Sequence, residues 1–192
     1  MTAGDRVSAL ACLCPATAFS YRPGIGFIRL LRPELGVAIG RLPRARLMRD
    51  LRMLFADASR IDDAWFEAAI DDFRNVWRSP MARLAFFSAA RNIYLDEPYG
   101  ENGFWGRLSR MEPRALYIFG TRDPLITARF GSKVRKSLPR ATVKVWSDCG
   151  HVPQLEWPDE TAAEMTSFFA EAMARRPTTQ SLSRKVIAGQ RA

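Results

Sequence analysis

Three short apolar runs, separated by longer segments with helical spacing, set the pattern of this chain. Residues 5–15 are apolar almost throughout. Residues 115–119 form a second run, and residues 142–147 form a third that is rich in β-branched and aromatic side chains. Continuous apolar runs are typical of parallel strands that are covered on both faces. The pattern therefore predicts an α/β protein with about three parallel strands and flanking helices.

The section from residue 18 to residue 112 has the spacing of helices and is rich in aromatic residues. Pro43 suits the first turn of a helix that runs to about Phe55, and Asp62 or Asp63 can cap the next helix. Along this second helix, apolar residues recur at helical spacing: Trp65, Phe66, Ala69, Ile70, Phe73, Val76 and Trp77. We interpret them as core residues, and they also fit the wall of an apolar substrate tunnel.

Further helices are predicted later in the chain. Ser79 followed by Pro80 begins a third helix, and Phe104 begins the return to the sheet. Residues 127–138 and 159–174 have helical spacing, with a proline next to each. From residue 175 the periodicity is lost and the composition turns basic, which predicts a disordered tail.

Polar residues follow the second and third apolar runs, where each strand is expected to end. Gly120-Thr121-Arg122-Asp123-Pro124 follows one run, and Gly150-His151 follows the other. His151 is the only histidine of the 192 residues and comes 151 − 123 = 28 positions after Asp123. In an open α/β sheet, ligands and catalytic side chains gather at the carboxyl ends of the strands. The spacing therefore predicts an acid and an imidazole at one edge of the sheet.

These two loops, residues 120–125 and 150–156, resemble the last two catalytic loops of the α/β-hydrolase superfamily. The closer likeness is to its capped branch of esterases, epoxide hydrolases and carbon–carbon bond hydrolases. In that family the nucleophile comes first along the chain, then the acid, then the histidine. The resemblance implies that Asp123 is the triad acid and that His151 is the general base.

The resemblance also implies a division of the chain. Residues 1–17 and 113–174 would form a partial α/β-hydrolase core, residues 18–112 a helical cap, and residues 175–192 the basic tail. The family's nucleophile turn, Gly-x-Ser-x-Gly or its Asp variant, is absent upstream of Asp123. We therefore expect a hydrolase of an ester or a related apolar substrate, truncated before its nucleophile and inactive alone. The alternative is a non-catalytic remnant that binds an apolar ligand or a partner chain.

Charge changes this interpretation little. The formal net charge is +9, and 29 − 4 = 25 of the basic residues are arginines. A basic protein attracts nucleic acid or anionic membranes. The arginines are spread along the chain without a nucleic-acid-binding motif, so we do not expect nucleic acid as a partner. Between Arg41 and Arg52, five arginines lie opposite apolar residues; we interpret them as a solvated face, with a membrane surface as the weaker alternative.

The three cysteines do not make a disulfide framework, and we expect free thiols in a reducing, cytoplasmic compartment. Cys12 and Cys14 fall on one face of the first predicted strand. Cys149 is two positions from His151, which is the wrong loop for a nucleophile. Asp148, just before it, suits a turn. With a single histidine and no ligand-spacing motif, the sequence predicts no metal site and no cofactor.

The outer edge of the first predicted strand bears on possible partners. If its outer neighbour is missing, its apolar edge is left unpaired, and such an edge invites pairing with another chain. We therefore predict a homo-oligomer that pairs through this sheet edge, or a protein that needs a complementing fragment.

Overall fold

The computed structural model describes residues 7–15, 43–95 and 97–174 of the 192-residue chain. The start of the first predicted strand, residues 18–42 of the predicted cap and the predicted tail at 175–192 lie outside these residues.

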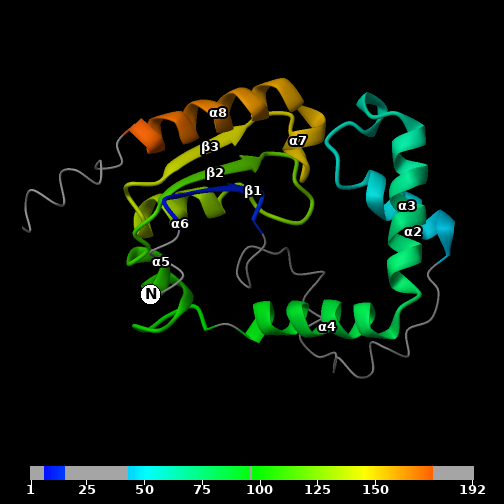
Figure 1. Cartoon of the computed structure of the whole chain (residues 1–192), viewed down its shortest axis with the longest axis horizontal. Helices are drawn as coiled ribbons and strands as arrows, with labels where there is room; N and C mark the ends of the chain where they lie inside the picture. The colour runs from blue at the N-terminus through cyan, green and yellow to red at the C-terminus, as the bar shows by residue number, and fades with distance from the viewer. Residues whose placement is uncertain (1–6, 16–42, 96, 175–192) are drawn as a thin grey trace, which may run out of the picture.

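The three apolar runs form one parallel sheet, as the sequence predicts. Its strands, in the spatial order β1-β2-β3, are β1 (Ala9–Leu13), β2 (Arg114–Gly120) and β3 (Thr142–Trp146). In the register, Ala9 lies opposite Arg114 and Leu116 lies opposite Thr142. All three strands therefore end at the same edge of the sheet, which Figure 1 shows facing α3 and α7.

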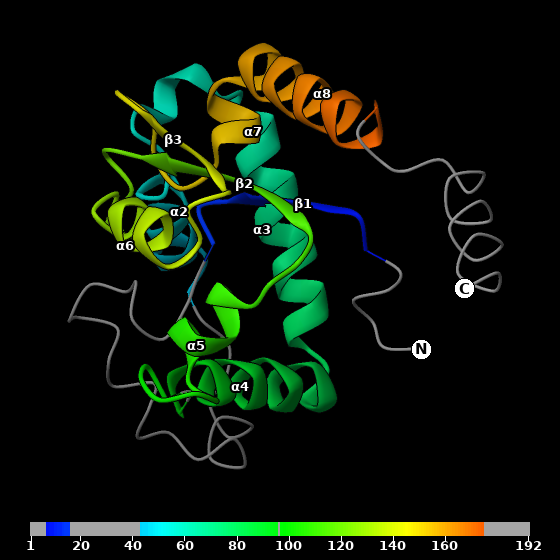
Figure 2. The ribbon, with the colours of Figure 1, turned by 90° about the vertical axis from the view of Figure 1, so that its left-hand side faces the viewer.

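Helices cover both faces of the sheet and lie beyond the ends of its strands. In the view of Figure 2, α8 (Pro158–Ala174) lies over one face and α6 (Phe130–Ser137) under the other. The short helix α7 (Pro153–Glu156) precedes α8. Between β1 and β2 the chain forms what we call the helical insertion: α2 (Arg44–Arg52), the 3-10 helix η3 (Ala58–Arg60), α3 (Asp63–Trp77), α4 (Pro80–Leu95) and α5 (Phe104–Ser109).

The central strand β2 builds a core on each face, because successive side chains of a strand point to opposite sides. Tyr117 and Phe119 join the α6 side of the core, with Phe130 and Val134. Leu116 and Ile118 join the α8 side, with Phe168. Every residue of β2 from Ala115 to Gly120 is buried, which explains why the strand is an unbroken apolar run.

Local capping explains where the helices begin. The side chain of Asp62 accepts a hydrogen bond from the backbone N–H of Ala64 at 2.8 Å, so Asp62 is the residue that caps α3. Ser79 Oγ accepts from Ala82 N at 3.3 Å at the start of α4. The return to the sheet begins at Phe104, as predicted, with one short helix, α5, before β2.

The predicted core face of α3 is partly wrong. Phe66, Ile70 and Trp77 are buried, but Val76 is 61% exposed and Phe73 is 37% exposed. Among the described elements α3 packs against α2 and α4, and these two neighbours leave part of its apolar stripe uncovered. Apolar spacing therefore identified the helix correctly and overestimated the width of its buried face.

Two of the α2 arginines form ion pairs with α3. Arg44 pairs with Glu67 and Asp71 of α3, and Arg52 pairs with Asp63 at 2.5 Å. These pairs join the two helices through exposed side chains. No helix among the described residues has the length and apolar character needed to cross a membrane.

Gly120, the last residue of β2, packs directly against the loop that follows β3. A Cβ atom at this position would lie 2.2 Å from the carbonyl oxygen of Cys149 and 2.3 Å from that of Gly150. Without one, the backbone N–H of Arg122 donates to Cys149 O at 2.9 Å. The absence of a side chain at Gly120 therefore lets the two loops at the sheet edge touch.

We expect Gly120→Ala to lower the free energy of unfolding by about 1–3 kcal/mol, because the new methyl group meets backbone atoms that cannot turn aside. Gly131→Ala in α6 is the matched control. Its Cβ would approach only the Val143 and Phe119 side chains, at 3.1 and 3.2 Å, and alanine favours a helix by about 1 kcal/mol. Urea denaturation measures both variants, and equal losses would contradict the assignment of Gly120 to a backbone junction.

Candidate functional site

The carboxylate of Asp123 lies at the end of β2, in the turn that the sequence predicts. Its side chain is 1% exposed. Oδ1 accepts hydrogen bonds from the backbone N–H groups of Leu125 at 2.7 Å and Ile126 at 2.8 Å. Burying a charge is costly unless donors replace the lost water. The turn therefore supplies the amides that let an acid persist inside the protein.

The imidazole of His151 reaches this carboxylate from the loop after β3. His151 Nδ1 lies 2.8 Å from Asp123 Oδ2. An ionised carboxylate only accepts hydrogen bonds, so Nδ1 carries the proton and Nε2 of the neutral ring is left as the basic nitrogen. The His151 side chain is 23% exposed. The structure thus brings the two predicted site residues together, with the acid buried and the imidazole partly open to solvent.

A second buried carboxylate, Glu156, holds the histidine loop against the helical insertion. Glu156 is 5% exposed. Oε1 accepts from the backbone N–H of Gly150 at 2.8 Å, and Oε2 accepts from that of Ala56 at 2.7 Å. The backbone N–H of His151 in turn donates to Leu54 O at 2.7 Å. Two of these three hydrogen bonds fix the histidine loop to the segment that follows α2, and the third joins Gly150 to Glu156; we call the three the Glu156 clamp.

Gly150 makes the Glu156 clamp sterically possible. A Cβ atom at Gly150 would lie 2.4 Å from Leu54 O and 2.6 Å from Ala56 N. Only glycine therefore fits this close backbone approach. The sequence does not predict which segment approaches, because that segment lies about a hundred residues earlier in the chain.

Asp148 has the turn role that the sequence predicts for it. Its backbone φ is +54°, a conformation that few residues other than glycine adopt. Its carboxylate pairs with Arg60 of η3 and, at 2.7 Å, with Arg122 Nη1. The hydrogen bond from Arg60 is the main reason that the pKa of this carboxyl lies below its usual range. Asp148 therefore joins the histidine loop to the helical insertion and to the Asp123 turn.

Cys14 is the site residue that the sequence analysis missed. It was predicted to lie on a strand face with Cys12, but β1 ends at Leu13 and Cys14 has a φ of +43°. This turn buries the thiol, which is 2% exposed, with Sγ 3.6 Å from Gly150 O. Candidate ligand atoms of Cys14, Asp123 and His151 all lie within 4.8 Å of one another. A sequence search for a cysteine just beyond a strand at this edge would have found it.

The thiols near the site are held in the protonated form. Burial, and then the charge of Asp123, raises the pKa of Cys14 well above its usual range. Burial raises the pKa of Cys149 to about 12. A thiol with so high a pKa is a poor nucleophile at neutral pH. This agrees with the expectation that Cys149 is not a nucleophile.

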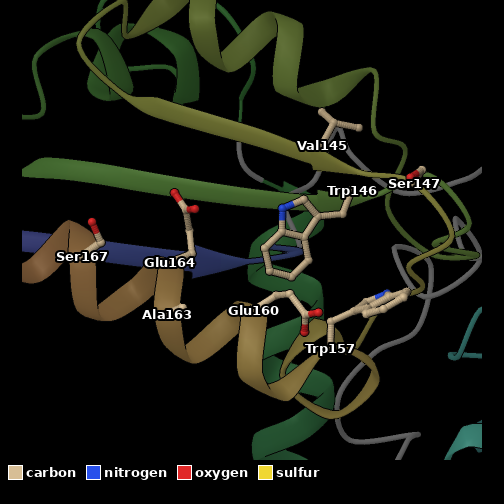
Figure 3. A pocket seen from close by; sticks show the side chains of 8 residues that line it. All are labelled: Val145, Trp146, Ser147, Trp157, Glu160, Ala163, Glu164 and Ser167. Carbon is tan, nitrogen blue, oxygen red and sulfur yellow. The ribbon is translucent and has the colours of Figure 1, made fainter.

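A pocket of about 650 Å³ lies elsewhere, between β3 and the first half of α8 (Figure 3). Trp146 and Trp157 line it, with Glu160 and Glu164 from the helix. Neither Asp123 nor His151 lines this pocket. The acid–imidazole pair and this hollow are therefore separate features of the surface.

Three comparisons with known proteins bear on the family. The model of the "Alpha/beta hydrolase family" matches residues 1–164. No curated protein matches the sequence.

Among solved structures, a membrane phospholipase A described as a novel bacterial virulence factor has a TM-score of 0.65 and 21% identity, over 89% of this chain and 51% of that one. A meta-cleavage product hydrolase from Pseudomonas fluorescens IP01 has a TM-score of 0.65 and 18% identity, over 88% of this chain and 58% of that one. The carboxylesterase CesB from Bacillus subtilis has a TM-score of 0.54 and 17% identity, over 87% of this chain and 53% of that one.

Identities this low show the fold alone, and the chain spans only about half the length of the solved structures that it matches. The sheet, its flanking helices and its helical insertion are thus a partial α/β-hydrolase fold. The match of the family model to residues 1–164 goes further, and by it this chain belongs to the α/β-hydrolase family.

Proposed function

We propose that this chain carries the acid and the base of a hydrolase site that cleaves an ester or a related apolar substrate. The observation that carries the proposal is the 2.8 Å contact between His151 Nδ1 and the buried Asp123 carboxylate, at the ends of adjacent strands. An oriented imidazole next to a buried acid is the arrangement that general-base catalysis requires.

In this mechanism His151 Nε2 takes the proton of the attacking hydroxyl or water as that oxygen bonds to the substrate carbon. Asp123 accepts the Nδ1–H hydrogen bond throughout and stabilises the imidazolium ion. The imidazolium then gives its proton to the leaving group, which restores the neutral ring.

The nucleophile in this proposal comes from polypeptide beyond these 192 residues, since they hold no Gly-x-Ser-x-Gly turn upstream of Asp123. The edge of β1 supports such an arrangement. Among the described strands β1 pairs with β2 alone, and Leu10 on it is 38% exposed. An unpaired apolar edge accepts a further strand. We infer that this edge receives either the nucleophile-bearing segment or, in its absence, a second copy of the chain.

The names of the similar structures support the substrate class. They include a carboxylesterase, a phospholipase A and a meta-cleavage product hydrolase, and the first two names denote enzymes that act on esters. In Figure 1, α2 and α3 of the helical insertion lie beyond the ends of the strands, which is where the capped branch of the family would have its cap. Ester hydrolysis is therefore the first activity to test.

We expect the 192-residue chain alone to leave a p-nitrophenyl ester intact, and the same chain extended by its upstream-encoded sequence to hydrolyse it. In the extended protein, His151→Ala should reduce kcat/KM by about 10⁴-fold, because the base that activates the nucleophile is lost. Asp123→Asn should have a similar effect, because the asparagine no longer fixes the productive tautomer.

Asp159→Asn, an exposed carboxylate in the first turn of α8, is the control and should leave kcat/KM unchanged. Turnover that survives His151→Ala would overturn the assignment of the base. An extended protein that binds the ester without hydrolysing it would favour the non-catalytic alternative instead.

A separate prediction concerns the Glu156 clamp. Glu156→Gln replaces one acceptor oxygen by an NH₂ group, which then faces the N–H of either Gly150 or Ala56. We expect the free energy of unfolding to fall by about 1–3 kcal/mol, the usual cost of a buried polar group left without a partner. Hydrogen exchange at these two amides should accelerate together.

Glu160→Gln, an exposed acid four residues along in α8, is the matched control and should change neither quantity. Faster exchange at Gly150 with unchanged exchange at Ala56 would show that the clamp does not act as one unit.

A further inference from the structure

Three side chains that can hold a metal ion meet at the carboxyl edge of the sheet, one from the end of each strand. Cys14 directly follows β1, Asp123 follows β2 and His151 follows β3. One candidate ligand atom from each lies within 4.8 Å of the other two. Cys14 and Asp123 are buried, and His151 is half-buried. The hydrolytic mechanism uses two of these side chains and leaves the thiol without a task.

We propose that Cys14, Asp123 and His151 bind a divalent cation of the zinc class, and that this binding and the action of His151 as a base exclude one another. The sequence analysis predicted no metal site, because it counted one histidine and found no ligand spacing. The parallel register assembles the three ligands from positions 14, 123 and 151 instead.

The donor set selects the metal. A thiolate, an imidazole nitrogen and one carboxylate oxygen are ligands that Zn²⁺ accepts, at about 2.3 Å for sulfur and about 2.0–2.2 Å for nitrogen and oxygen. Mg²⁺ and Ca²⁺ prefer oxygen ligands alone. A soft donor such as sulfur therefore favours Zn²⁺, Cd²⁺ or Co²⁺ over the hard cations.

Coordination of an ion requires these ligand atoms to shift from their present positions. Tetrahedral coordination at these bond lengths separates two ligand atoms by about 3.3–3.6 Å. His151 Nδ1 and Asp123 Oδ2, now 2.8 Å apart, would move apart slightly, and the thiol would move inward. The partly exposed His151 side chain offers the route by which an ion enters, since the other two ligands are buried.

Binding removes the proton of the Cys14 thiol and moves the proton of the His151 ring to its other nitrogen. The Cys14 thiol gives its proton to the buffer, because the metal ion stabilises the thiolate. The neutral imidazole binds through Nδ1, so its single proton moves from Nδ1 to Nε2 by way of solvent. No electron is transferred, and one proton leaves for each ion bound. With Nε2 protonated and Nδ1 on the metal, His151 cannot accept a proton from a nucleophile.

The test uses Co²⁺ as the probe on the untagged 192-residue protein, because a thiolate bound to Co²⁺ gives a near-ultraviolet charge-transfer band. We expect one Co²⁺ per chain, displaced by Zn²⁺ and not by Mg²⁺. The Co²⁺ measurement does not depend on turnover. Absence of Co²⁺ binding and absence of hydrolase activity can therefore be told apart.

Cys14→Ser should abolish the charge-transfer band and weaken binding by at least about 100-fold, more than the loss of a supporting contact alone would do. Cys12→Ser, within β1 and two residues before Cys14, is the matched control and should keep both. His151→Gln is the second variant, should Cys14→Ser fail to fold by circular dichroism, and it should also weaken binding by at least about 100-fold. Retention of the band in Cys14→Ser, wild-type affinity in His151→Gln, or no band in the wild-type protein would overturn the proposal.

Discussion

One buried carboxylate, that of Glu156, joins two parts of the chain that lie a hundred residues apart. It accepts the N–H of Gly150 in the histidine loop and the N–H of Ala56 after α2. If the two segments separated, the backbone N–H groups of Ala56 and His151 would lose their acceptors, which is costly for buried polar groups. The orientation of His151 therefore depends on the helical insertion as much as on the sheet that carries it.

The two buried acids at this edge show how the same side-chain chemistry serves two purposes. Asp123 has one oxygen on the amides of Leu125 and Ile126 and the other on His151, so it presents one acceptor to a titratable ring. Glu156 has both oxygens on backbone amides and presents none. The first arrangement can stabilise a charge that appears and disappears during a reaction, whereas the second can only stabilise a conformation.

The sequence predicted those features that are local in the chain. The strands were predictable because a parallel strand covered on both faces is apolar throughout, and the acid and the histidine were predictable because each directly follows a strand. The Glu156 clamp was not predictable, since no pattern connects residue 156 to residues 54–56. Cys14 was missed because an apolar run does not reveal that its last residue turns to a φ of +43°. Val76 was placed in the core because spacing defines a helical face but not the width of its cover.

The strand order also limits where the rest of a reaction centre can lie. β3 supplies the imidazole, β2 supplies the carboxylate, and β1 brings the Cys14 thiol to the same edge. The pair is formed between two adjacent strands, with the acid on the central one, so the next strand end in the series belongs beyond β1. Among the described strands nothing pairs with that side of β1, and Leu10 there is partly exposed. A nucleophile at the end of a strand that pairs with β1 would complete the series at the same edge. Nε2 of His151 is the nitrogen left to receive its proton.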